Sequence, residues 1–195
     1  IFNKTTQSAL KHTLEEVIDD VTLWDLDNPN LYQLNVYTED DHYGVRFGFR
    51  TIEFKKDGFY LNGKSLKLIG LNRHQSYPYV GYAMPKRIQQ QDADILKYEL
   101  GVNVVRSSHY PPSTHFIERC DEIGLLLFEE LPGWQHIGGN NFITNGLKAI
   151  EEMIIRDRNH PSIILWGVRI NESVDHHEFY ERSNRLARTL DPTRP

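Results

Sequence analysis

The sequence predicts a partial immunoglobulin-like β-sandwich followed by an α/β domain that forms the first four βα units of a (β/α)8 TIM barrel. Polar and apolar residues alternate over the first part of the chain, as in half-exposed antiparallel strands. After about residue 65, apolar strands alternate with helical stretches, as in parallel βαβ units. We therefore expect a sandwich domain over 1–55 and the N-terminal half of a barrel domain over 56–195.

The expected sandwich rests on two alternating segments, 31–37 and 43–50, with turn-forming residues at 27–30. Three or four strands are expected here, fewer than the roughly seven of a complete immunoglobulin-like sandwich. The segment therefore resembles the back half of such a domain. Residues 54–64 predict a small hairpin, with Asn62–Gly63 as its turn.

The barrel expectation rests on the order of the later elements. Apolar strands are predicted at 66–71, 102–106, 125–129 and 162–168, and helices at 85–99, 113–122, 144–157 and 175–189. Pro85 suits the first helical position, and Gly101 and Gly124 suit positions just past a helix end. A complete barrel needs eight units in about 250 residues, so half a barrel is expected.

Composition excludes several partners. The chain has 195 residues and a formal net charge of −5, which argues against nucleic acid or an anionic membrane as a partner. No apolar run approaches the roughly 20 residues that span a bilayer. Cys120 is the single cysteine, so no internal disulfide can form. Because the chain starts at Ile1 without Met, we expect its natural N-terminus to lie upstream, and the sequence assigns no compartment.

Polar residues follow every predicted barrel strand. They are Asn72–Arg73–His74, Ser107–Ser108–His109–Tyr110, Glu129–Glu130 and Asn171–Glu172. The carboxyl ends of parallel strands meet at one mouth, where (β/α) barrels carry their active sites. Adjacent residues on a strand face opposite sides, so only one of Glu129 and Glu130 can face the mouth, and Glu130 is preferred because it lies nearer the strand end. The pattern predicts an active site.

Each candidate also has a purely structural interpretation. Glu172 could be a charge at the N-terminus of the helix at 175–189, favoured by its dipole. His74 and His109 could each be hydrogen-bonded core histidines, and Arg106 could pair with a carboxylate without touching substrate. A metal site is the main competing chemistry, because six potential ligands are available: His74, His109, His115, His136, Glu130 and Glu172. No zinc-type spacing is present, so we expect no metal.

At these residues the chain resembles glycoside hydrolase family 2, the β-galactosidase and β-glucuronidase group. The resemblance runs in order over nearly the whole chain. The matching stretches are Gly48–Arg50, Leu61–Lys64, Gly70–His74, Asn103–Pro111, Cys120–Gly124, Arg156–Ser162, Asn171–Glu172 and Leu190–Pro195. The long blocks at 103–111 and 156–162 make the resemblance specific.

The resemblance implies roles for the residues at the mouth. Glu172 would be the general acid/base, and Asn171 would hydrogen-bond the 2-hydroxyl of the sugar. His109 would contact the sugar and help to stabilise the transition state. The pocket floor would be shaped by Arg106, His74 and Glu130. The family nucleophile is a second Glu on the seventh barrel strand, and no residue of this chain matches it. We therefore expect the isolated chain to be inactive and to self-associate through exposed barrel edges.

Two stretches differ from the family pattern. Magnesium-dependent β-galactosidases of the family carry a Glu-x-His arrangement just after the third strand, and here Trp134 stands where that Glu would fall. We therefore expect no cofactor and no magnesium ion at Glu172. Trp134 could be a sugar-stacking platform or barrel-rim packing. The approach at 166–170 also differs from the common pattern, which indicates a subgroup of unassigned substrate.

The resemblance implies a retaining β-glycosidase whose substrate is an oligosaccharide or glycoside, with β-galactosides expected first. In such enzymes two carboxyl groups lie about 5–5.5 Å apart, and their mutual repulsion keeps one of them, here Glu172, protonated near neutral pH. A β-glucuronidase or β-mannosidase of the same family is an alternative. A non-catalytic carbohydrate-binding scaffold on a degenerate barrel is the alternative from a different class.

Overall fold

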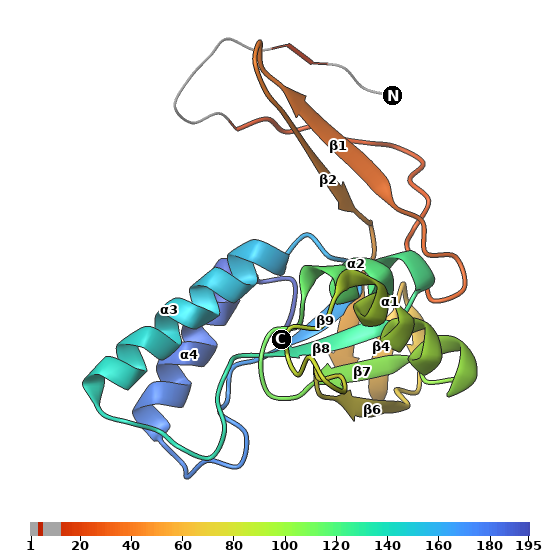
Figure 1. The fold of residues 1–195 in the computed structure, drawn as a ribbon. Coiled ribbons are helices and arrows are strands. Elements are labelled where there is room, and N and C mark those ends of the chain that lie inside the picture. Colours follow the sequence, from red (N-terminus) through yellow and green to blue (C-terminus); the bar gives the residue numbers. More distant parts are fainter. Residues whose placement is uncertain (1–3, 6–12) are drawn as a thin grey trace.

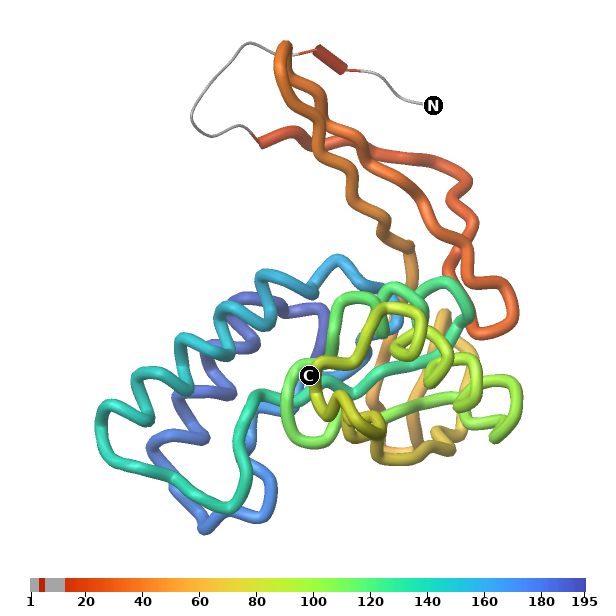
Figure 2. Tube along the Cα trace, viewed as in Figure 1, coloured from red at the N-terminus to blue at the C-terminus, as the bar shows by residue number. Residues whose placement is uncertain are grey.

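A computed structural model describes residues 4–5 and 13–195 of the chain. Its strands form three separate sheets, with two, three and four strands. Figure 1 shows the two-stranded sheet projecting from an α/β body that contains the other two sheets and all the labelled helices. Figure 2 shows the chain running out along this projection and returning to the α/β body.

The projecting sheet is an antiparallel hairpin of β1 (Tyr32–Tyr37) and β2 (His42–Phe47). A third strand, β3, follows at Ile52–Lys55, so the described part of residues 1–55 contains three strands, within the three or four that were expected. Strand β3 does not pair with this hairpin and belongs to the next sheet. The immunoglobulin-like sandwich stays a prediction.

A three-stranded antiparallel sheet follows, made of β3 (Ile52–Lys55), β4 (Gly58–Leu61) and β5 (Lys64–Leu66). The predicted Asn62–Gly63 turn between β4 and β5 is confirmed, with φ of 51° and 76°. Such a turn needs positive φ at both positions, which Asn and Gly tolerate. Strand β3 pairs with β4 across the domain boundary predicted at residue 55, and that boundary stays a prediction.

The third sheet is parallel, and its strands stand in sequence order: β6 (Gly70–Arg73), β7 (Val104–Ser107), β8 (Leu126–Glu130) and β9 (Ile163–Gly167). Strand β6 starts later than the predicted 66–71, because Lys64–Leu66 pairs with β4 instead. Gly70 allows β6 to approach β7 closely, since a Cβ there would lie 2.1 Å from the Val104 carbonyl oxygen.

Helices follow each strand of the parallel sheet. They are α1 (Lys86–Asp94), which continues as the π-helical turn η1 (Ile95–Glu99), α2 (Thr114–Ile123), α3 (Asn140–Asp157) and α4 (His177–Leu190). Gly124 ends α2 with a φ of 72°, and Gly101 follows η1 with a φ of 65°, as their positions predicted. Pro85 precedes the first helical residue of α1 and does not occupy it, one position earlier than expected. Figure 1 shows α3 and α4 side by side.

The two faces of the parallel sheet differ. The outer face packs against the helices through fully buried side chains such as Val105, Leu127 and Ile163. The small antiparallel sheet packs at the amino-terminal end, where Phe59 contacts the cluster that contains Leu126. The inner face borders a hollow of about 400 Å³ lined by Phe54, Leu68, Gly70, Leu71, Asn72, Val104, Arg106, Phe128, Ile164 and Leu165. Parallel strands with helices on one side and an open hollow on the other form a partial (β/α) barrel.

No helix among residues 13–195 has the length and apolar character that crossing a bilayer requires.

Candidate active site

The candidate site lies at the carboxyl ends of the parallel strands. Asn72 and Arg106 line the hollow, and Glu130 lies on the same side, because its carboxylate accepts from Arg106. Arg73 follows Asn72 in β6, but its guanidinium binds Asp92 of α1 at 2.9 Å and so does not contribute to the mouth. Strand position alone therefore over-counted the polar groups that converge here.

Glu129 and Glu130 face opposite sides of the sheet. The Glu129 side chain is fully buried beside Arg156 and Asp157 of α3. Burial, followed by the Asp157 charge, raises the pKa of Glu129 well above its usual range. Glu130 instead points to Arg106 on the hollow side. Of the two, Glu130 is the one at the mouth.

Arg106 connects the polar ends of the four strands. Its guanidinium donates to both carboxylate oxygens of the buried Glu130, at 2.6 Å to Oε1 and 3.0 Å to Oε2. The same group donates to Asn171 Oδ1 at 2.7 Å and to Asn72 Oδ1 at 3.3 Å. The planar fork of Arg suits this two-point binding, which Lys cannot reproduce. Arg106 therefore forms the ion pair with Glu130 that a structural role requires, and it also contacts the candidate site residue Asn171.

The two histidines stand beside this network. His109 Nδ1 lies 3.4 Å from Glu130 Oε2, and His109 Nε2 lies 3.5 Å from Asn171 Nδ2. Arg106 Nη2 also lies 3.5 Å from His109 Nδ1, so this imidazole nitrogen stands between the guanidinium and the carboxylate. The rings of His74 and His109 meet edge to face, with centroids 5.2 Å apart. His74 is exposed, so the core-histidine interpretation was wrong for it.

Glu172 follows Asn171 directly in the sequence and is exposed to solvent. Its Oε2 accepts hydrogen bonds of 3.0 Å from Trp134 Nε1 and of 3.0 Å from Gln135 Nε2. These donors, Gln135 first, lower the pKa of Glu172, and the charge of nearby His109 acts in the same direction. Helix α4 begins only at residue 177, so Glu172 lies outside its first turn. The interpretation as a helix-terminus charge was therefore wrong.

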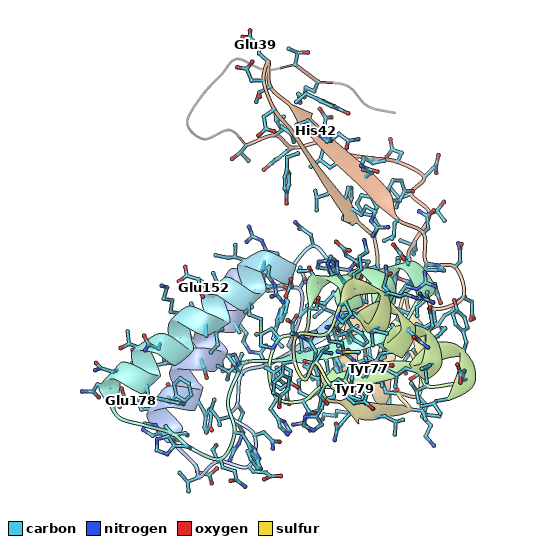
Figure 3. All side chains as sticks on the ribbon, in the orientation of Figure 1. Glu39, His42, Tyr77, Tyr79, Glu152 and Glu178 are labelled. Carbon is cyan, nitrogen blue, oxygen red and sulfur yellow. The ribbon has the colours of Figure 1, made fainter. Side chains whose placement is uncertain are left out.

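The loop after β8 reaches the loop after β9. Trp134 and Asn171 form an isolated parallel bridge, in which the Gln135 amide donates to the Asn171 carbonyl at 2.8 Å. The indole of Trp134 is 59 % exposed, so it does not pack into the rim. Figure 3 labels Tyr77 and Tyr79, which lie close together on the loop that follows β6. The loops after β8 and β9 thus meet beside the polar network.

Sequence reasoning named Asn72 among the strand-end residues without giving it a role, and it missed Gln135. Asn72 is two residues before His74 and so shares its face of the strand, which could have assigned it to the site. No local pattern indicates Gln135, since its contact with Glu172 depends on how two loops meet. Two further histidines lie elsewhere: His136 packs against Phe142, and His115 lies near Glu118 of its own helix.

Other residues of the family-like stretches hold the segment that leads into β9. Arg50 donates to the carbonyl oxygens of Pro161 at 2.7 Å and of Ile163 at 2.5 Å, and Arg194 donates to that of His160 at 2.8 Å. Burial, with the nearby charge of Arg194, lowers the pKa of Arg50 to about 9. Because Asn171 and Glu172 follow β9, these contacts position the candidate site from a distance.

Comparisons with known proteins agree with this geometry. Two family models cover the chain: "Glycosyl hydrolases family 2" matches residues 2–50, and "Glycosyl hydrolases family 2, TIM barrel domain" matches residues 52–195. A parallel sheet whose carboxyl ends carry carboxylates, an amide and imidazoles defines the class as a barrel hydrolase. The chain belongs to glycosyl hydrolase family 2.

Several relatives are similar over most of the chain. A β-galactosidase of Thermoanaerobacterium thermosulfurigenes is 60 % identical over 183 residues, which are 92 % of this chain and 26 % of that protein. A crystal structure of Parabacteroides merdae β-glucuronidase is 34 % identical with a TM-score of 0.80, and covers 91 % of this chain and 24 % of its own. A structure of a β-galacturonidase from Eisenbergiella tayi bound to galacturonate is 32 % identical with a TM-score of 0.84. It covers 94 % of this chain and 34 % of its own. This chain therefore spans about a quarter of the length of the β-galactosidase that it matches.

Proposed function

We propose that this chain supplies the acid/base half of the active site of a retaining β-glycosidase that cleaves β-galactosides. The observation that carries the proposal is the network joining Asn171 to Arg106, Glu130 and His109, directly beside the exposed carboxylate of Glu172. The choice of galactoside is supported by the 60 % identical relative named β-galactosidase. The proposal includes the finer fold assignment, namely the back of an immunoglobulin-like sandwich and four of eight βα units.

Arg106 orients the amide of Asn171 for a sugar. Because Asn171 Oδ1 accepts from the guanidinium at 2.7 Å, the amide presents its NH2 as a donor to the rest of the site, with Nδ2 3.5 Å from His109 Nε2. In the proposed site it donates to the 2-hydroxyl of the sugar, a hydrogen bond that strengthens as the oxocarbenium-like transition state develops. His109 and His74 line the same floor, and Trp134 offers an exposed indole face on which a sugar ring can stack.

Glu172 donates a proton to the leaving oxygen in the first step and takes one from water in the second. Its donors favour the charged carboxylate, so holding the proton at neutral pH requires a second negative charge nearby. That charge is the nucleophilic carboxylate, about 5–5.5 Å away in retaining enzymes. We assign it to a part of the full-length enzyme outside this chain. Glu130 does not serve, because Arg106 occupies both of its oxygens.

Glu172 does not fit a magnesium site. The indole N–H of Trp134 donates to Oε2, so a hydrogen-bond donor stands where a cation would bind. Among residues 13–195, no three His, Cys, Asp or Glu side chains gather in a way that could hold a metal ion.

Glu172→Gln in the full-length enzyme tests this assignment. Gln cannot donate a proton, so we expect kcat/KM for a disaccharide, whose leaving group needs protonation, to fall by about 10²-fold or more. Turnover of an activated aryl glycoside, whose leaving group departs unaided, should fall far less. Equal losses on both substrates would refute the acid role.

A panel of aryl β-glycosides on the unmodified enzyme distinguishes the alternatives. Preference for galactosides supports the proposal, and preference for glucuronides or mannosides replaces the substrate assignment. The absence of turnover with every glycoside, together with sugar binding, would favour the non-catalytic scaffold. The isolated chain should turn over none of them, since it lacks the assigned nucleophile.

A further inference from the structure

We propose that Trp134 and Gln135 are positioning residues that hold one oxygen of Glu172 and so determine which oxygen carries the catalytic proton. The inference rests on the proposed acid/base role of Glu172. It concerns two residues on the loop after β8, whose contacts with Glu172 come from the folded arrangement of two loops.

Both donors bind the same carboxylate oxygen. Trp134 Nε1 and Gln135 Nε2 each lie 3.0 Å from Glu172 Oε2. The indole N–H can only donate, so Oε2 must act as an acceptor. A proton on Oε2 would face these donors and lose both hydrogen bonds. The proton of the neutral acid therefore resides on Oε1, which neither donor binds.

The loop that carries the donors is itself anchored to the site. Backbone hydrogen bonds join Gly133 N to the His109 carbonyl at 3.1 Å and Gln135 N to the Asn171 carbonyl at 2.8 Å. A Cβ at Gly133 would lie 2.4 Å from Ile170, so the loop packs closely on the segment before Asn171. Glu172 has a φ of 54°, a left-handed conformation that non-glycine residues seldom adopt. The position of the Glu172 carboxylate therefore depends on the backbone conformation of Glu172 and on the hydrogen bonds from Trp134 and Gln135.

This arrangement suits both steps of a retaining mechanism. In the first step the Oε1–H bond breaks as the glycosidic oxygen gains the proton, and the C1–O bond pair goes to the leaving group while the nucleophilic carboxylate bonds to C1. In the second step water attacks C1, releases the carboxylate, and returns a proton to Oε1. Glu172 is a carboxylate between the steps, and the two donors stabilise that form.

The surroundings of Glu172 contain few other charges that could mimic the effect. His109, on the loop after β7, is the charged neighbour that acts on it among the described residues. A hydrogen bond from neighbouring Asn171 also lowers the pKa of Glu172, but neither Asn171 nor the two donors carries a charge. Arg106 pairs with Glu130 and contacts Asn171, and neither residue of this ion pair is hydrogen-bonded to Glu172. Removing a donor therefore changes the environment of Glu172 without removing a charge.

Two variants separate the donors from the rest of the loop. Gln135→Leu keeps the approximate size of the side chain and loses the donor, and Trp134→Phe keeps an aromatic ring and loses the N–H. His136→Ala is the matched control, because His136 is on the same loop and packs against Phe142 without contacting Glu172. Trp134 and Gln135 are exposed, so neither change removes core packing.

The first readout needs no activity. Carboxyl ¹³C NMR titration of the 195-residue chain, with the Glu172 signal assigned from Glu172→Gln, should show a raised pKa for Glu172 in both donor variants and an unchanged one in His136→Ala. An unchanged pKa in both donor variants overturns the proposal. The proposed function could still stand, because Glu172 could be the acid without these donors.

The second readout uses the full-length enzyme. Loss of a hydrogen bond to the charged carboxylate should reduce kcat for a disaccharide about tenfold, with an activated aryl glycoside little affected in its first step. The alkaline limb of the pH profile should move to higher pH in both donor variants. Equal losses on both substrates with an unmoved pH profile would mean that the loop acts only structurally. If Glu172→Gln itself changes no rate, the proposed function fails independently of the NMR result.

Discussion

Asp121 and His160 form a buried contact that supports β9, and replacing Asp121 by Asn tests its importance. The Asp121 carboxylate lies 2.5 Å from His160 Nδ1 and accepts from the Ser162 backbone N–H at 3.0 Å. Its side chain is only 5 % exposed. Ser162 immediately precedes β9, so the contact holds the strand that leads to Asn171 and Glu172. Asn removes the charge and keeps one acceptor oxygen, while its NH2 group replaces the other of the two oxygens that accept from His160 and Ser162.

The expected magnitude depends on the charge of His160. Burial lowers the pKa of His160, but the Asp121 carboxylate outweighs it, and the net pKa is raised above 6.5. A raised folded-state pKa means that this stabilisation is fully present below pH 6.5 and is lost as the pH rises through the folded-state value. Breaking a buried ion pair costs about 3 kcal/mol, whereas weakening a neutral hydrogen bond costs about 1 kcal/mol. Asp121→Asn should therefore destabilise by about 3 kcal/mol at pH 6 and by about 1 kcal/mol at pH 9.

Urea unfolding of the chain at the two pH values checks this. With a slope of about 3 kcal/mol per molar urea, the midpoint should fall by about 1 M at pH 6 and by about 0.3 M at pH 9. Asp175→Asn is the matched control, because its ion pair with Arg169 is on the surface and the Asp175 side chain is 89 % exposed. It should shift neither midpoint measurably. A loss of only about 1 kcal/mol at both pH values for Asp121→Asn would show that His160 is uncharged in the folded chain and refute the reasoning.

Two further predictions concern Glu130 and Glu129, the last two residues of β8. Arg106→Lys removes the fork that binds Glu130 and orients Asn171, so kcat/KM of the full-length enzyme should fall about 10²-fold with an unchanged circular dichroism spectrum; a loss under threefold would contradict the role of Arg106. Glu129 has a raised pKa, so its stabilisation is full below pH 4.5 and is lost as the pH rises through the folded-state value. Glu129→Gln should flatten the fall of Tm with pH above 4.5, and parallel Tm curves would contradict a protonated Glu129.

Local sequence patterns were informative where one interaction dominates. Apolar strands and amphipathic helices follow from burial of one face, and Gly101 and Gly124 mark helix ends because they readily adopt positive φ. The same patterns failed where two partners compete for one segment. The apolar residues from 66 onward could extend β6, but β4 recruits the first of them into a hairpin.

Strand order and side-chain alternation are local properties of the chain, so the sequence alone predicted polar groups at one end of a parallel sheet, with Glu130 rather than Glu129 facing the mouth. Asn171 and Glu172 stood out because they follow an apolar strand. The pairing of Arg73 with α1, and the contacts of Gln135 and Trp134 with Glu172, depend on the folded arrangement of distant segments. Those contacts join residues 37 and 38 positions apart, and the charge state of a carboxyl group depends on such neighbours rather than on its position in the sequence.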